Sequence, residues 1–160
     1  ATLERGPRGK LGDPAMKLFT IGFTQTSAEH FFRRLIDAHV RRVIDVRLNN
    51  TSQLAGFAKA RDLAYFLKAL GEIGYLHEPL LAPTQDILTA YKKGKGDWSE
   101  YEKCFLDLME KRRIDERLDP ALFDQGCLLC SEAKPHYCHR RLVAAYLTDR
   151  WSQPIQVKHL

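Results

Sequence analysis

The side chains best suited to chemistry gather near the carboxyl terminus, where Cys127, Cys130, Cys138 and His139 lie within a short stretch. Zinc prefers thiolate sulfur and imidazole nitrogen, so this composition fits a metal site. The spacing fits less well. Residues 126–130 have the pattern of a strand, which would point Cys127 and Cys130 to opposite faces. Neighbouring helical residues are about 100° apart, which makes joint binding by Cys138 and His139 awkward. The residues therefore leave metal binding open.

Thiol chemistry is the alternative for the same stretch. A cysteine at a strand end or a helix N-terminus has a lowered pKa, because backbone amides and the helix dipole favour the thiolate. Cys130 or Cys138 would then act as a nucleophile, a sulfur carrier or a redox thiol, and His139 or Glu132 would move protons. A plain structural role is the third interpretation, and Cys127 fits it best, because small buried cysteines often fill a core.

A second set of polar residues follows two strands near the amino terminus. Thr20 and Gly22 end the first predicted strand, and Asp45 and Arg47 end the second. Residues two apart on a strand face the same side, so Asp45 and Arg47 could pair or present opposite charges to a ligand. Together with Arg140, Arg47 could hold a phosphate or carboxylate through bidentate contacts.

The elements that must position these residues alternate between strands and helices. Short apolar runs predict strands at residues 17–21, 42–47, 75–78, 126–130 and 155–158. Helices are predicted from the capping sequence at residues 26–29, over 63–73 with Gly74 as the C-cap, over 84–91, from Asp97, and from Pro135 to about Trp151. This alternation predicts an α/β fold, a three-layer and Rossmann-like domain with a mostly parallel sheet.

Length and composition limit the class of protein. The chain has 160 residues, of which 44% are hydrophobic and 28% charged, as expected for one globular domain. No apolar run approaches the roughly 20 residues that a membrane span needs, and no secretory signal is visible, which predicts a cytoplasmic protein without a membrane partner. Residues 1–15 have the composition of a flexible leader added ahead of Met16, which leaves a single domain at 16–160.

The charge favours an anionic partner. Lys and Arg number 25 against 20 Asp and Glu, which gives a net charge of +5. An excess of this kind suits a phosphate-bearing substrate or nucleic acid. The basic turn at residues 92–96 could meet phosphates, although such runs are more often solvated loops. The common Gly-rich nucleotide loops are absent from the sequence.

Three segments together resemble one family, the domain of unknown function four-eight-eight. They are Thr20-Ile21-Gly22, Val43-Ile44-Asp45-Val46-Arg47, and Cys127-Leu128-Leu129-Cys130-Ser131-Glu132 with Cys138-His139-Arg140. The resemblance covers residues 16–160 and implies an α/β fold, but it implies no reaction. Phe23-Thr24 stands where the family commonly has His-Ser. The positions that match the family pattern are Thr20, Gly22, Asp45, Arg47, Cys130, Glu132, Cys138, His139 and Arg140.

Three hypotheses for the function follow. The first is an enzyme with catalytic Cys130, Glu132, Cys138 and His139, acting on an anionic substrate such as a nucleotide or nucleic acid. The second is a noncatalytic nucleic-acid-binding module, in which a metal or buried thiols only organise the last helix and the basic residues make the contacts. Those residues would be Lys92, Lys93, Lys95, Arg140 and Arg141. The third is a thiol redox or sulfur-transfer protein.

Overall fold

Five parallel strands form one sheet in the computed structural model, which describes residues 15–50, 56–93, 96–132 and 135–160. The strands are β1 (Met16–Gly22), β2 (Arg42–Asp45), β3 (Gly74–His77), β4 (Gly126–Cys130) and β5 (Ile155–His159). Their order across the sheet is β3-β2-β4-β1-β5, and each neighbouring pair is parallel. The predicted α/β class is confirmed, and the sheet is wholly parallel.

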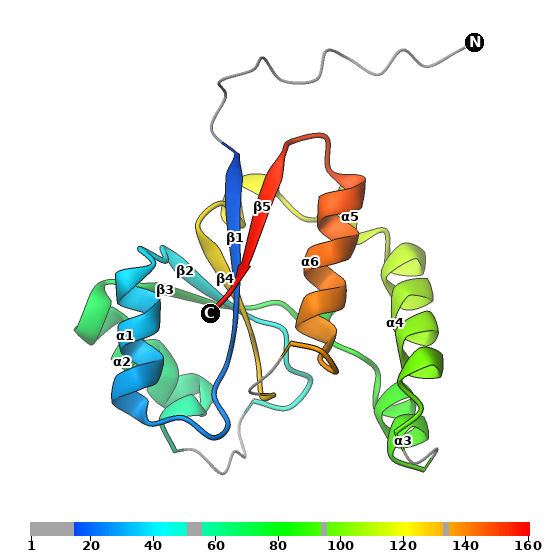
Figure 1. Ribbon diagram of the computed structural model, residues 1–160, viewed down its shortest axis with the longest axis horizontal. Helices are drawn as coiled ribbons and strands as arrows, with labels where there is room; N and C mark the ends of the chain where they lie inside the picture. The colour runs from blue at the N-terminus through cyan, green and yellow to red at the C-terminus, as the bar shows by residue number, and fades with distance from the viewer. Residues whose placement is uncertain (1–14, 51–55, 94–95, 133–134) are drawn as a thin grey trace.

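Helices cover both faces of this sheet, which makes the domain three-layered and Rossmann-like (Figure 1). One face carries α1 (Ala28–Asp37) and α2 (Ala60–Gly71), with the 3-10 turn η1 (Gly56–Ala58) before α2. The other face carries α4 (Trp98–Arg112) and α6 (His139–Arg150). The remaining elements are α3 (Gln85–Lys93), α5 (Ile114–Arg117), η2 (Pro79–Leu81) and η3 (Pro120–Leu122). No helix in the described part of the chain is long and apolar enough to cross a bilayer.

The sheet separates two hydrophobic cores, and β4 contributes to both. Cys127 and Leu129 pack with the core beneath α1 and α2, whereas Leu128 and Cys130 pack with the core beneath α4 and α6. All four side chains are at most 5% exposed. This alternation follows from the two-residue period of a strand, and it confirms that Cys127 and Cys130 face opposite sides.

Two helix ends differ from the sequence-based expectation by one or two residues. Ser27, rather than Thr26, caps α1, because its Oγ accepts the His30 backbone N–H at 3.1 Å. At the carboxyl end of α2, Glu72 has a left-handed backbone conformation (φ 52°), and its N–H closes the last turn of the helix. Gly74, predicted as the C-cap, is instead the first residue of β3.

The start of the last helix is a larger correction. Pro135 was expected at its first turn, but α6 begins at His139. Cys138 is the N-cap and has an extended backbone (φ −134°, ψ 137°), because a turn joins its N–H to the Pro135 carbonyl at 3.3 Å. Cys138 therefore does not follow the helical 100° spacing, and its side chain is free to lie on the same side as that of His139.

The sheet has a topological switch point between β1 and β4. The chain leaves β1 toward α1 on one face and leaves β4 toward α6 on the opposite face (Figure 1). In open α/β sheets, ligands bind in the crevice outside the carboxyl ends of two such strands. The two loops meet there, because the Thr24 backbone N–H donates to the Ser131 carbonyl at 3.1 Å.

Gly22 lies at the end of β1, where these two loops meet. It pairs with Cys130 across the β1–β4 ladder. A Cβ at this position would overlap the Glu132 backbone carbonyl and would come within 2.8 Å of Arg140 Nη1. Only glycine leaves room for the loop after β4 to fold over the end of β1.

Replacement of Gly22 by alanine should therefore destabilise the protein. Because the clash is with backbone, we expect Gly22→Ala to lower the free energy of unfolding by about 3 kcal/mol or more. Gly56→Ala is the matched control, since a Cβ there meets nothing within 4 Å, and it should change stability by less than about 0.5 kcal/mol. Urea unfolding of both variants measures the difference, and equal stabilities would contradict the close approach at Gly22.

Candidate functional site

Polar side chains occupy the carboxyl edge of the sheet from one side to the other. On the outer strands, His77 Nε2 lies 3.0 Å from the Arg47 carbonyl, and His159 Nδ1 lies 2.6 Å from Thr20 Oγ1. On the inner strands, Asp45 ends β2 and Cys130 ends β4. Parallel strands bring their carboxyl ends to one edge, so this band follows from the topology.

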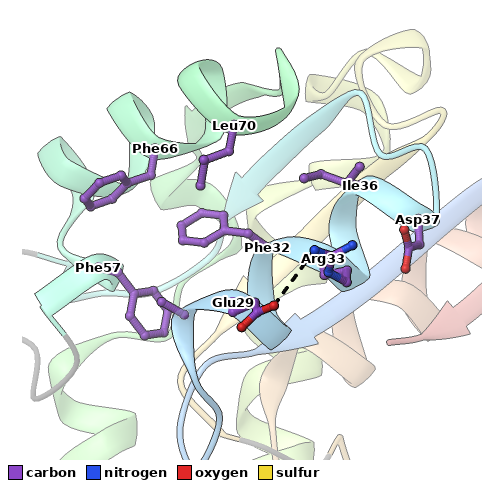
Figure 2. A pocket seen from close by; sticks show the side chains of 9 residues that line it. Glu29, Phe32, Arg33, Ile36, Asp37, Phe57, Phe66 and Leu70 are labelled. Atoms are coloured by element: carbon purple, nitrogen blue, oxygen red, sulfur yellow. Dashed lines mark ion pairs between the residues drawn. The ribbon is translucent and has the colours of Figure 1, made fainter.

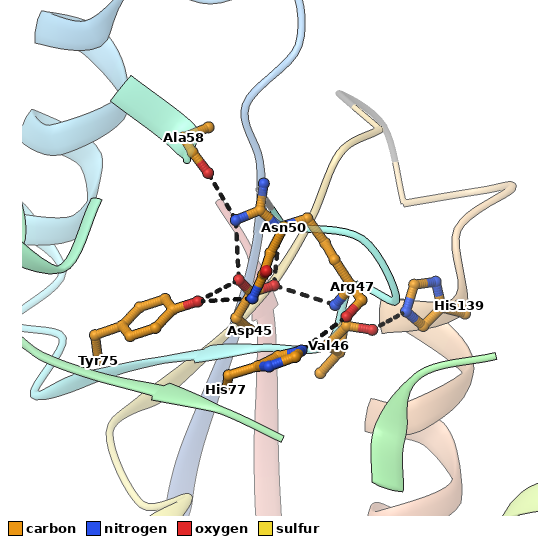
Figure 3. A network of polar contacts seen from close by, with 8 residues as sticks. All are labelled: Asp45, Val46, Arg47, Asn50, Ala58, Tyr75, His77 and His139. Carbon is orange, nitrogen blue, oxygen red and sulfur yellow. Dashed lines mark hydrogen bonds and ion pairs between the residues drawn. The ribbon is translucent and has the colours of Figure 1, made fainter. Parts of the chain in front are cut away.

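Asp45 and Arg47 form a buried ion pair beside β3 (Figure 3). Arg47 Nε and Nη2 each donate to one carboxylate oxygen of Asp45 at 2.9 Å, which is the bidentate geometry. The Tyr75 hydroxyl donates to the same carboxylate at 2.6 Å, and Arg47 Nη2 also donates to the Ala58 carbonyl at 2.7 Å. Asp45 and Arg47 face the same side, as predicted, and each is the ion-pair partner of the other.

Three reactive side chains converge at the end of β4. The Cys130, Cys138 and His139 ligand atoms all lie within 4.8 Å of one another, and each residue is at most 6% exposed. Cys130 Sγ lies 3.4 Å from His139 Nδ1. Cys130 ends a strand, Cys138 caps α6 and His139 begins it, so the cluster forms where β4 and α6 meet.

The His139 ring has a defined orientation. Its Nε2 lies 2.6 Å from the Val46 backbone carbonyl, which can only accept a hydrogen bond (Figure 3). Nε2 must therefore carry the proton and donate it. In the neutral ring, Nδ1 is then the unprotonated nitrogen, and its lone pair points toward Cys130 Sγ.

The two thiols of the cluster have opposite pKa shifts. The hydrogen bond from the Cys138 thiol lowers the pKa of Cys130, and His139 and Arg140 add to this against the effect of burial. Burial, followed by the hydrogen bond to Cys130, raises the pKa of Cys138. For His139, burial disfavours the charged ring, but the neighbouring Cys130 raises the pKa overall. Cys130 is thus the thiol that most readily becomes a thiolate.

Cys127 differs from Cys130 in the side of the sheet that it faces and in the direction of its pKa shift. It is fully buried on the other side of the sheet, and burial raises the pKa of its thiol. Cys104 lies on α4 outside the cluster, where its thiol donates to Glu100 at 3.5 Å. The expected structural role fits Cys127.

Arg140 is fully buried and holds the crevice together. Its Nε lies 3.3 Å from Thr20 Oγ1, and its Nη1 donates to the Glu132 backbone carbonyl. The guanidinium therefore connects β1 to the loop after β4. Glu132 itself is exposed, and its backbone rather than its carboxylate takes part in these contacts.

Four residues of this edge escaped sequence reasoning: Arg34, Tyr75, His77 and His159. Each of the two histidines is the last residue of a strand, β3 or β5, that the sequence predicts at nearly the same place. The parallel topology could have placed both at the ligand edge. Arg34 and Tyr75 carried no such signal, because their roles depend on side chains from other elements.

Arg34 lies on α1 beside the end of β1. Its Nη2 is 3.4 Å from the Gly22 carbonyl, and its Nε is buried without a hydrogen-bond partner among the described residues. Burial lowers the pKa of the guanidinium, and the positive charge of Arg140 lowers it further, whereas Cys127 opposes the shift. Two guanidinium groups thus flank the same strand end from opposite faces of the sheet.

An apolar groove of about 420 Å³ lies between α1, η1 and α2 (Figure 2). Phe32, Phe57, Phe66 and Leu70 form its apolar lining, with the Glu29–Arg33 ion pair at its rim. None of its lining residues belongs to the polar edge, so the groove is separate from the candidate site.

The fold and the site define a parallel α/β domain with a buried thiol and imidazole cluster at its switch point. A family model described as "Domain of unknown function DUF488" matches residues 27–147, and the chain belongs to this family. The resemblance seen in the sequence is thereby confirmed. No curated protein matches, and no solved structure matches.

The Asp45–Arg47 pair should contribute strongly to stability. Asp45→Asn keeps the shape but leaves the buried Arg47 charge uncompensated, so we expect a loss of about 3–5 kcal/mol. Tyr75→Phe removes one hydrogen bond to the same carboxylate and should cost about 1 kcal/mol.

The exposed pair of Glu29 and Arg33, 3.9 Å apart, is the control for these variants. Glu29→Gln should change stability by less than about 0.5 kcal/mol. Urea unfolding measures the free energy of unfolding of the three variants. An Asp45→Asn protein as stable as Glu29→Gln would show that the buried pair does not support the fold.

Proposed function

We propose that this protein is an enzyme that acts on an anionic substrate at the carboxyl ends of β1 and β4. The observation that carries the proposal is the position of Arg34 at the carboxyl end of β1, the strand that pairs with β4. Its half-buried guanidinium contacts Gly22 and forms no ion pair among the described residues, while Cys130 is the register partner of Gly22. A cation at this strand end, with a buried Nε that has no partner among the described residues, favours an anion there.

The residues divide into three roles under this proposal. Arg34 binds the anionic group, and the neighbouring charge of Arg140 strengthens the positive potential at the crevice. Cys130 and His139 form the reactive centre, in which a thiolate sulfur is available either as a nucleophile or as a metal ligand. Thr20, Gly22 and Arg140 act as positioning residues, because they hold the loop after β4 against β1.

The two other sequence-based hypotheses have less support from the contacts. A nucleic-acid module that uses Arg140 as a surface contact conflicts with the complete burial of that residue. Lys92 and Lys93 end α3, and Lys95 lies outside the described residues. A freely exchanging redox thiol conflicts with the burial of Cys130 and Cys138, which are 5% and 2% exposed.

Anion binding by Arg34 can be measured directly with inorganic phosphate. Calorimetric titration at low ionic strength should detect binding to the chelator-treated full chain. Arg34→Gln removes a charge-assisted hydrogen bond and should weaken the affinity about 10- to 100-fold. Arg33→Gln is the matched control, because this neighbour on α1 has a 68% exposed side chain paired with Glu29, and it should leave the affinity unchanged. Equal losses of phosphate affinity in both variants would show that only the net charge matters, which would contradict a specific site at Arg34.

Catalysis requires a second experiment. The wild-type chain is incubated with a panel of phosphomonoesters, including nucleotides, and products are scanned by mass spectrometry. Cys130→Ala should bind phosphate normally but lose conversion by at least about 100-fold. Cys104→Ala should retain both, since Cys104 lies outside the cluster. Phosphate binding without conversion of any panel member would contradict the enzymatic part of the proposal.

A further inference from the structure

We propose that Cys130, Cys138 and His139 form a zinc-binding site with an open coordination position at the β1–β4 crevice. The inference deepens the proposed function, because it assigns a metal cofactor to the reactive centre of that site. It rests on the placement of three donor atoms, on the second hydrogen bond of the histidine, and on the burial of the cluster.

The donor distances suit a tetrahedral ion. With bond lengths of about 2.3 Å for Zn–S and about 2.0 Å for Zn–N, a sulfur and a nitrogen on one ion are about 3.5 Å apart. Cys130 Sγ and His139 Nδ1 are 3.4 Å apart. The sulfur of Cys138 completes a set of donors that all lie within 4.8 Å of one another. Two thiolates and one neutral imidazole would balance the charge of a divalent ion.

The hydrogen bond to Val46 prepares His139 for this role. A histidine that binds a metal through one nitrogen usually donates its other N–H to a carbonyl or carboxylate. His139 Nε2–H donates to the Val46 carbonyl at 2.6 Å, which leaves the Nδ1 lone pair facing the Cys130 sulfur. Phe105 packs against the same ring with centroids 5.4 Å apart and restricts its rotation.

Burial favours a metal over a free nucleophile. Cys130 and Cys138 are at most 5% exposed, and a buried ionised group needs a partner or a metal ion to compensate its charge. A metal ion needs only the space between the donors, and it uses both thiols and the imidazole together. Thiolate and imidazole ligands select zinc over magnesium or calcium.

Three protein ligands among the described residues make this site resemble the catalytic class. Structural zinc sites have four protein ligands, whereas catalytic sites have three and keep the fourth position for water or substrate. The cluster contains two cysteines and one histidine, and no fourth donor joins them in the described part of the chain. Gly22 pairs with Cys130, so this open position would belong to the end of β4 that borders β1.

The metal content of the full chain, purified without a metal column or chelator, tests this inference. We expect about one equivalent of zinc per chain by mass spectrometry. After chelation, Co²⁺ should restore one equivalent and give the visible absorption bands of a tetrahedral thiolate site. Cys130→Ala and Cys138→Ala should each retain less than a tenth of an equivalent.

Cys127→Ala is the matched control, because Cys127 is equally buried in the same strand but faces the other side of the sheet. It should keep the full equivalent. If the other two variants fail to fold, Cys130→Ser and Cys138→Ser, which keep the side-chain volume, replace them and should each lose the Co²⁺ thiolate absorption bands. Less than a tenth of an equivalent of any metal, with no Co²⁺ bands, would overturn the inference. Since the phosphate titration uses chelated protein, its result is independent of this outcome.

Discussion

The contact between the His139 imidazole and the Val46 carbonyl joins the first turn of α6 to the segment after β2. Those two elements belong to different parts of the chain, and β4 lies between β2 and β1 in the sheet. Arg140, the next residue of the helix, points about 100° away and reaches Thr20 on β1. The first two residues of α6 therefore straddle β4, and together they set the position of the helix over the sheet.

This arrangement explains why the cluster forms where it does. Once His139 is held against Val46, its Nδ1 faces the end of β4, and Cys130 is the residue that ends that strand. Arg140 holds the Glu132 carbonyl close to Gly22, so the loop after β4 folds back and places Cys138 beside the same sulfur. The chain can follow this path only with glycine at position 22, because a Cβ there would overlap the Glu132 carbonyl.

Charge is distributed unevenly along the carboxyl edge. Asp45 neutralises Arg47 inside the protein, and the Tyr75 hydroxyl and Ala58 carbonyl supply further partners. Near β1, by contrast, Arg34 and Arg140 lie on opposite faces of the sheet around one strand end. The acidic Asp45 thus compensates the charge at the β2 end of the edge, while two guanidinium groups lie around the end of β1.

Apolar runs and helical spacing predicted most of the fold, because the central strands β1 and β4 are apolar and helices such as α1 and α2 bury one face. The same two-residue period placed Cys127 away from Cys130 before any contact was known. Helix ends were harder to predict, since Thr26 and Ser27 are equally good caps as isolated residues. The start of α6 was misplaced because a turn, which has no period, separates Pro135 from the helix.

By itself, the amino-acid sequence determined the α/β class, the strands that bear the polar residues, and the short list that includes Cys130, Cys138 and His139. These inferences from the sequence are local, because secondary-structure propensity and hydrophobic period act over a few neighbouring residues. Only the tertiary structure decided which of those residues meet. The strand order placed Val46 and Thr20 on opposite sides of β4, and the extended backbone at Cys138 turned its sulfur toward Cys130. Both depend on packing between segments far apart in the chain, which no local pattern encodes.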